Sequence, residues 1–376
     1  MRSPLRRPAA LLALALLAVT AARADSGSLP LQRIVLGELG GWIALTVTIG
    51  GQEGRWLLDS GASRNLVSPA LARRLGLEPT GRVRAETPLG RVEGDEVALP
   101  SLRTGALERA GQQAMVIELQ QVLGAAAQGV DGVLAVPWME GVQAELDLRA
   151  WTARFSPGGA ADCPEGMASV ALTRLRSLPV IELQVGQARE RYVLDSGNPA
   201  GLIRVEAEAA DAATPGLALP GGLRLTVLRE VALGAQRRLD VPVTRFASAP
   251  LARALGGQVR GLAGTALLDG ARWRLDLARG QLCVEAGRFA TPGGFGLLPE
   301  REGEALVVRL VLPDSPAERA GLRAGDVVAR WAGLPAARPL AELWQAVQGR
   351  EALALTVGSP PREVTLQRAI FAPVAP

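Results

Sequence analysis

The sequence predicts a mainly β protein made of two similar lobes, related by a pseudo-twofold axis, and a smaller domain after them. The 376 residues are too many for one ordinary core. The 44 Gly and 26 Pro residues punctuate short apolar runs, which is typical of strands joined by turns. A block of sequence occurs twice, and the pattern changes from about Pro292 onward.

The first 24 residues have the pattern of a signal peptide. Three Arg residues lie near the start, an apolar stretch runs from Pro8 to Ala21, and Ala22–Ala24 has the small-x-small form of a cleavage site. The apolar stretch is shorter than the roughly 20 residues that a membrane span needs. We therefore expect a periplasmic or secreted protein with no stable membrane span after cleavage.

The charge and composition exclude several classes of function. Four Arg residues within residues 1–24 account for the net charge of +4, and removing them leaves 37 Arg against 37 Asp and Glu. Such a balance gives no electrostatic footprint for nucleic acid, so we expect no nucleic-acid partner. The chain has no His, which removes His-based triads and most zinc sites. We expect no metal and no cofactor.

The repeated block contains an Asp-Ser-Gly tripeptide after an apolar strand. Val47–Gly50 leads to Trp56–Ser63, and Leu183–Gly186 leads to Tyr192–Pro199. Each copy reads as a strand, a Gly turn, a second strand and the tripeptide. We therefore expect two β-hairpins, each of which delivers an Asp to a Gly-containing loop.

A second pair of matching segments follows the first. Asp131–Ala135 leads to Glu145–Leu148, and Arg260–Gly264 leads to Arg274–Leu277. The two copies of this segment are about seven residues closer together than the two Asp-Ser-Gly copies. One surface loop of the second lobe is therefore expected to be about seven residues shorter, because such length changes occur in loops.

The repeats place the two lobes at about residues 30–158 and 168–290, joined by a polar, Gly-rich link from Ser156 to Pro164. Helix content should be low. We expect short helices at Pro69–Leu75 and Pro250–Gly256.

Residues 292–370 form the predicted third domain. Its strand Val307–Leu312 precedes a turn-rich segment and an amphipathic helix at Leu340–Gln348. Two closing strands are expected at Ala352–Val357 and Glu363–Gln367.

The chemistry depends on the two Asp residues, Asp59 and Asp195. Two carboxylates held face to face cannot both ionise, so one keeps a proton. The ionised carboxylate then takes a proton from water while the protonated one polarises a carbonyl. Such a pair can hydrolyse a peptide bond without His, Cys or metal.

The repeat resembles the pepsin and retropepsin aspartic peptidases, in the bacterial exported form with tandem lobes and a PDZ domain. Their Asp-Thr/Ser-Gly motif follows apolar residues, and an apolar-apolar-Gly strand threads beneath it. Leu262–Gly264 matches this strand, and Val133–Ala135 matches with Ala in place of Gly. The resemblance covers residues 30–290.

The resemblance implies closed β-barrel lobes and an aspartic endopeptidase that cuts peptides or unfolded proteins. Asp59 and Asp195 would be its catalytic pair. The supporting loop residues would be Ser60, Gly61, Ala62, Ser196, Gly197 and Asn198. The Ser hydroxyls would bond across the lobe interface.

Several residues depart from the family pattern. Asn198 and Pro199 do not match, so Asn198 either donates a hydrogen bond that lowers the pKa of Asp195 or marks a degraded second site. Ala135 adds a methyl group where close backbone contact is expected. The expected flap tip, Thr87–Val92, contains no Tyr.

Three other readings of the lobes stay open. The lobes bind peptides without cutting them, as part of an inactive adaptor. The first lobes of two chains pair and the second lobe is a relic. The Asp loops are merely tight turns of a duplicated barrel.

The C-terminal block resembles a PDZ domain, a partly open β-barrel with two helices. Asp314–Leu322 and Gly325–Val328 match the central segment of that family. Ser315 caps a short helix whose first turn holds Pro316.

PDZ domains bind a free C-terminus as an added strand. The loop Gly294, Phe295, Gly296 and Leu297 resembles the PDZ carboxylate-binding loop, with an interdomain hinge as the alternative. We expect the groove between Val307–Leu312 and the helix Leu340–Gln348, with Phe295, Leu297 or Leu343 against the last side chain of the ligand.

The chain has two Cys residues, Cys163 and Cys283. An even count in an exported protein favours a disulfide between them. Two buried free thiols are the alternative.

Overall fold

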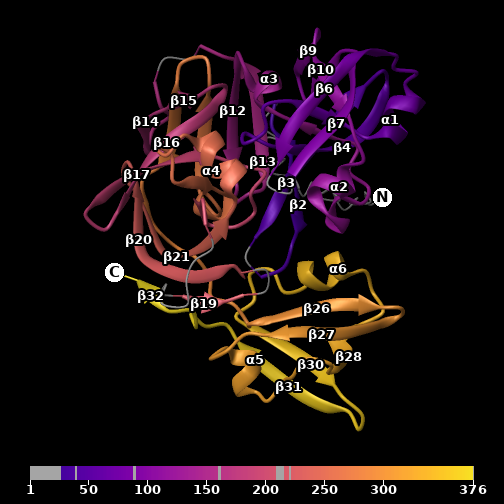
Figure 1. Ribbon diagram of the computed structural model, residues 1–376, viewed down its shortest axis with the longest axis vertical. Coiled ribbons are helices and arrows are strands. Elements are labelled where there is room, and N and C mark those ends of the chain that lie inside the picture. Colours follow the sequence, from indigo (N-terminus) through magenta and orange to yellow (C-terminus); the bar gives the residue numbers. More distant parts are fainter. Residues whose placement is uncertain are drawn as a thin grey trace, which may run out of the picture.

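The computed structural model describes residues 27–38, 40–87, 90–159, 162–208, 216–219 and 222–375, which form four β-sheets (Figure 1). The protein is mainly β, as predicted. The predicted signal peptide and the centre of the expected flap tip lie outside the described residues. Within the described ranges, no helix is long and apolar enough to cross a membrane.

The first sheet has ten strands in the order β6-β7-β10-β5-β11-β4-β3-β8-β9, with β2 paired to β3. Apolar side chains on both faces of β3 and β4 are buried, because this hairpin crosses the middle of the core. The strands are β2 (Gln32–Val35), β3 (Gly41–Ile49), β4 (Gln52–Leu58), β5 (Asn65–Val67), β6 (Pro79–Thr87), β7 (Gly90–Ala98), β8 (Leu102–Thr104), β9 (Leu107–Arg109), β10 (Gln113–Val116) and β11 (Gly132–Leu134). The helices are α1 (Pro69–Arg74), α2 (Leu119–Leu123), η1 (Ala125–Ala127) and α3 (Val136–Met139).

The second sheet repeats this arrangement in the order β15-β16-β17-β22-β18-β21-β20-β19. Strand β25 adds to β21, and β32, from the far C-terminus, adds to β20. The strands are β15 (Thr173–Leu175), β16 (Leu178–Val185), β17 (Ala188–Leu194), β18 (Leu202–Glu206), β19 (Leu217–Ala218), β20 (Arg224–Leu233), β21 (Gln236–Ala247), β22 (Gly261–Ala263), β25 (Gly287–Ala290) and β32 (Val374–Ala375). The helices are α4 (Ala249–Leu255) and η3 (Thr265–Leu267).

The second sheet closes into a six-stranded barrel, whereas the first does not. An additional pairing between β16 and β20 completes the closed ladder. The first sheet has two separate strands, β7 and the short β8, where the second has the single strand β20, and Pro100 lies between β7 and β8. Proline has no N–H to donate, so the ladder breaks there. The expected closed barrel is therefore found in one copy and interrupted in the other.

A third sheet joins the two copies in the order β1-β13-β12-β23-β24-β14. Strands β12 and β23 pair antiparallel, so each copy contributes one strand to the central contact. The strands are β1 (Leu29–Pro30), β12 (Val142–Asp147), β13 (Thr152–Pro157), β14 (Met167–Ala171), β23 (Arg272–Asp276) and β24 (Gln281–Glu285).

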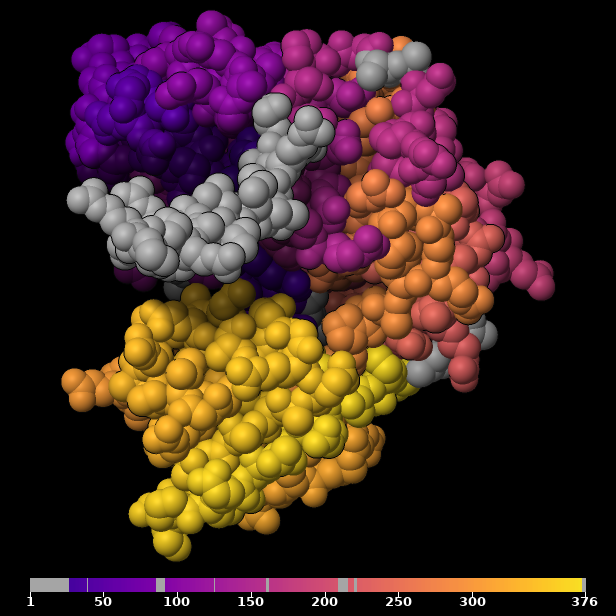
Figure 2. All heavy atoms as spheres, turned by 180° about the vertical axis from the view of Figure 1, so that it is seen from behind, coloured from indigo at the N-terminus to yellow at the C-terminus, as the bar shows by residue number. Residues whose placement is uncertain are grey.

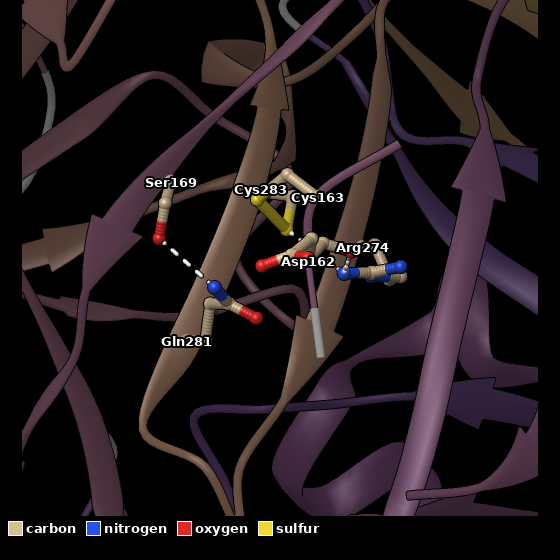
Figure 3. Close-up of a disulfide and its surroundings, with 6 residues drawn as sticks. All are labelled: Asp162, Cys163, Ser169, Arg274, Gln281 and Cys283. Carbon is tan, nitrogen blue, oxygen red and sulfur yellow. Dashed lines mark hydrogen bonds between the residues drawn. A yellow bond between two sulfur atoms is a disulfide. The ribbon is translucent and has the colours of Figure 1, made fainter. Parts of the chain in front are cut away.

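A disulfide joins Cys163, in the link between the copies, to Cys283 on β24 (Figure 3). The two Cα atoms are 5.5 Å apart, and Cys283 is fully buried. Beside it, Arg274 donates a hydrogen bond to the backbone oxygen of Asp162. The link is thereby fastened to the sheet that joins the copies.

The C-terminal domain has its own sheet, in the order β26-β27-β28-β30-β31 with β29 on β28, and its own core. Figure 2 shows it as a compact mass at the lower end of the molecule. Trp331 and Trp344 meet edge to face in that core, with ring centroids 4.9 Å apart. The elements are β26 (Leu297–Glu302), β27 (Ala305–Val311), α5 (Pro316–Arg319), β28 (Val327–Trp331), β29 (Leu334–Pro335), α6 (Leu340–Gln345), β30 (Ala352–Val357) and β31 (Arg362–Gln367).

The expected position of the peptide groove in this domain was wrong. Strand β27, which corresponds to the predicted Val307–Leu312 strand, pairs with β26 on one edge and β28 on the other. Its backbone groups have no free edge for an added strand. Strands β26 and β31 are the two edges of this sheet, and a strand added next to the Gly294–Leu297 loop would lie beside β26.

Replacing both Cys163 and Cys283 with Ser should destabilise the protein without changing its fold. A cross-link that closes a loop of this length typically contributes about 2–5 kcal/mol. Thermal unfolding followed by circular dichroism, with Ser169→Ala as a surface control, measures the loss. Mass spectrometry of unreduced protein from its native compartment tests the bond, and two alkylatable thiols there would contradict it.

Candidate active site

The two Asp-Ser-Gly loops occupy equivalent places in the two copies. Asp59 follows the end of β4, and Asp195 follows the end of β17. Strand β11 runs parallel to β4, and β22 runs parallel to β17. The backbone N–H of Asp59 donates to the oxygen of Leu134 and that of Asp195 to the oxygen of Ala263, each at 2.9 Å. A strand therefore supports each loop from below.

The hydroxyls of Ser60 and Ser196 tie the two loops to each other. Ser60 Oγ donates to the backbone oxygen of Leu194 at 2.7 Å and accepts from the N–H of Ser196 at 3.0 Å. Ser196 Oγ donates to the backbone oxygen of Leu58 at 2.8 Å and accepts from the N–H of Ser60 at 2.9 Å. Both side chains are buried. These four reciprocal bonds fix the loops in a symmetric arrangement.

The carboxyl groups of Asp59 and Asp195 lie close enough for each to shift the pKa of the other. The N–H of Gly61 also donates to Asp59 Oδ1 at 2.9 Å, and that of Gly197 to Asp195 Oδ1 at 3.0 Å. A Cβ on Gly61 would lie 2.3 Å from Asp195 Cγ, and one on Gly197 would lie 2.4 Å from Asp59 Cγ. Only glycine fits at these positions, because each loop backbone borders the carboxyl of the other copy.

The two carboxyls differ in acidity. Burial raises the pKa of Asp195 well above its ordinary value, and the negative charge of Asp59 raises it further. Burial also raises the pKa of Asp59, but the N–H of Gly61 and the hydrogen bond from Asp195 oppose that rise. The pair titrates as a unit, and the larger rise at Asp195 favours that residue as the protonated member.

Asn198 donates a hydrogen bond to Asp195, which is one of the two roles that the sequence suggested for it, but the donor is its backbone and not its side chain. Its backbone N–H donates to Asp195 Oδ1 at 3.1 Å and lowers that pKa. Its side-chain oxygen instead accepts from the N–H of Ala200 at 3.0 Å. This bond keeps the amide within its own loop. Asp195 thus receives backbone N–H bonds from Gly197 and Asn198 of its own loop, as Asp59 does from Gly61 and Ala62.

Asn65, which the sequence analysis did not single out, supports the first loop. It is fully buried; its side-chain oxygen accepts from the N–H of Ala135 at 2.9 Å and its amide donates to the oxygen of Gln113 at 3.0 Å. The methyl of Ala135 is accommodated in this copy. In the second copy, a Cβ on Gly264 would lie 2.4 Å from the oxygen of Asn198, so glycine is required only there. In the sequence, only the position of Asn65 beside the apolar residues Leu66 and Val67 could have pointed to this supporting role.

Ala62 belongs to the first loop: its backbone N–H bonds to Asp59 and lowers that pKa, and its oxygen accepts from the N–H of Val136 at 3.1 Å. The expected PDZ residues lie elsewhere. Gly294–Leu297 lies in the C-terminal domain, on a different sheet from the Asp pair. Among the described residues there is no cluster of acidic or Cys side chains that would hold a metal ion.

Comparison with known families points to the same chemistry for the first copy. Residues 45–138 match the family model described as aspartyl protease. This segment includes the Asp59 loop and the supporting strand β11. A search of curated proteins finds no match for the chain. The matched family indicates a peptide hydrolase of the aspartic class.

Replacing Asp195 with Asn should flatten the dependence of stability on pH. A carboxyl whose pKa is raised by folding stabilises the native state fully below its unfolded pKa of about 3.9, and that contribution is lost as pH rises. The wild-type melting temperature should therefore fall more between pH 4 and pH 7 than that of Asp195→Asn. Asp314→Asn, on an exposed turn, is the matched control. Equal slopes for wild type and Asp195→Asn would contradict the assigned protonation.

Proposed function

We propose that this protein is an exported aspartic endopeptidase in which Asp59 and Asp195 act on one peptide bond. The single observation that carries the proposal is the close pair of partly buried carboxyls, each bordered by the glycine of the opposite loop and held by reciprocal serine bonds at the junction of the two copies. The aspartyl protease match to residues 45–138 supports it independently. Export rests on the signal-peptide pattern of residues 1–24.

In the proposed mechanism, the two carboxyls have different tasks. Asp59, the ionised member, takes a proton from a water molecule, and the hydroxide formed adds to the carbonyl carbon of the substrate. Asp195 donates its proton to the carbonyl oxygen. The tetrahedral intermediate then collapses as the proton held by Asp59 passes to the leaving nitrogen and the C–N bond breaks. Asp195 regains its proton from the hydroxyl of the intermediate.

The geometry favours this function over an adaptor with a dead second lobe. The sequence feature that suggested a dead lobe was Asn198-Pro199. The loop that contains it nevertheless presents Asp195 with the same backbone support, the same serine bond and the same glycine contact as the first loop. The altered residues lie after the carboxyl and leave its position unchanged.

We also propose that the C-terminal domain is a PDZ domain that binds polypeptide C-termini. A six-stranded sheet and two short helices fit that class, and Ser315 caps α5 by accepting from the N–H of Glu318 at 3.2 Å. The loop Gly294–Leu297 directly precedes and enters the edge strand β26. Backbone N–H groups of such a loop bind a carboxylate beside the added strand.

Asp59→Asn and Asp195→Asn should each abolish cleavage of a peptide library, with a loss of at least about a hundredfold, because each removes one half of an acid–base pair. The amide keeps the volume and most hydrogen bonds. Asp314→Asn is the control with unchanged activity. Full activity of Asp195→Asn would refute the intramolecular pair, and a folded wild type that binds peptides without cutting them would favour the adaptor.

Cleavage should show a bell-shaped pH profile on the acid side of neutrality. Activity falls at low pH when both carboxyls are protonated, and it falls as pH rises through the raised upper pKa of the pair, because the shared proton is lost. Initial rates across the pH range measure this. Chelators should leave the rates unchanged; inactivation that added zinc reverses would exclude the mechanism.

A further inference from the structure

The proposed carboxylate-binding loop of the C-terminal domain already holds a carboxylate from the same chain. The side chain of Glu38 accepts hydrogen bonds from the backbone N–H groups of Phe295 at 2.8 Å, Gly296 at 3.1 Å and Leu297 at 3.2 Å. The positive charge of Arg368 also acts on this carboxylate. Three amides and one cation form the kind of site that a polypeptide C-terminus would need.

Glycine at position 294 makes room for this contact. A Cβ on Gly294 would lie 2.3 Å from Oε2 of Glu38. The residue therefore has to lack a side chain for a carboxylate to enter the loop.

The segment that carries Glu38 also fills apolar space in the same domain. Glu38 lies between β2 and β3 of the first sheet, and Figure 1 shows this hairpin reaching down to the C-terminal domain near α6. Strand β2 packs against α6. Val35, at the end of β2, is buried within the core of the C-terminal domain together with Phe295, Leu297 and Leu343. These three residues were expected to receive the last side chain of a ligand.

The hairpin does not pair with the edge strand. Strand β2 pairs with β3 alone, and no described strand pairs with the outer edge of β26. The hairpin therefore supplies a carboxylate and an aliphatic side chain without the added strand, which makes it a partial imitation of a C-terminal ligand.

The same hairpin touches the loop of Asp195. Trp42 Nε1 donates to the backbone oxygen of Gly197 at 2.8 Å, and Thr265 Oγ1 donates to the oxygen of Gly41 at 3.1 Å. A Cβ on Gly40 would lie 2.0 Å from the oxygen of Pro199. Arg33 on β2 forms an ion pair with Asp269 at 2.8 Å. The hairpin is thus packed between the C-terminal domain and the second Asp loop.

We propose that the β2–β3 hairpin is an internal ligand of the C-terminal groove, and that a polypeptide C-terminus binds there only by displacing Glu38 and Val35. This inference rests on the proposed PDZ function. The partner is a chain that ends in a free carboxylate and a small aliphatic side chain, because those are the two groups that the hairpin supplies. Occupancy by the hairpin lowers the apparent affinity for that partner in proportion to the open fraction.

The first test measures binding in an Asp59→Asn background, so that no probe is cut. The probe is a fluorescent polar decapeptide that ends in Val with a free carboxylate, and the matched probe has a C-terminal amide. Adding Glu38→Gln weakens the internal ligand, because a neutral amide loses the charge-assisted bonds. We expect about tenfold tighter binding of the free-acid peptide and no binding of the amide peptide. Glu53→Gln, on the neighbouring β3–β4 hairpin, should leave the affinity unchanged.

The second test detects displacement without changing the hairpin. Saturating free-acid peptide, added to the Asp59→Asn protein, should increase hydrogen exchange of the amides in residues 32–38. Gly294→Ala, added to Glu38→Gln, should abolish binding, since its methyl occupies the place of the carboxylate.

Three outcomes would overturn the proposal: equal affinity with and without Glu38→Gln, binding with no change in exchange, or no binding of the free-acid peptide to the folded Glu38→Gln protein. Because these measurements need no catalysis, their failure is distinct from failure of the proposed peptidase activity.

Discussion

The shared proton of Asp59 and Asp195 is the constraint on which the rest of the structure depends. Two neighbouring, partly buried carboxyls are tolerated only if one stays protonated and both receive hydrogen bonds. The glycines, the crossed serine bonds and the parallel strands beneath the loops all supply or permit those bonds. The joining sheet then holds the two copies together so that the loops meet. The symmetry of the fold follows from the need to bring two equivalent acids to one point.

Much of this arrangement was predictable because local signals and repetition agree. A Gly turn between apolar strands predicts a hairpin, and the second occurrence of the same pattern places Asp195 opposite Asp59. The helices after Ser68 and Ser248 were predictable for a similar reason: each Ser caps a first turn that contains proline. The strands of the C-terminal domain also lie close to their expected positions, since alternating apolar residues define them.

The features that escaped prediction depend on contacts between distant segments. No local pattern shows that Glu38 meets a loop 257 to 259 residues away or that the last strand, β32, pairs with β20. The interruption of the first barrel at Pro100 could not be predicted, because the sequence does not show which strand would otherwise be continuous. The groove was misplaced because the order of strands in a sheet depends on pairing partners, which a single strand pattern does not reveal. Asn65 looked like any polar residue in a short strand.

The disulfide also determines what happens to this molecule when its backbone is cut once. Cys163 and Cys283 enclose β14 to β24, which include the whole closed barrel and the Asp195 loop, in one covalent ring. A single cut anywhere inside that ring opens the backbone but leaves both fragments attached through the sulfur atoms. The pieces remain at high local concentration, so the barrel stays assembled around the nick. The disulfide therefore keeps a single backbone cut in this segment from separating the chain into two pieces.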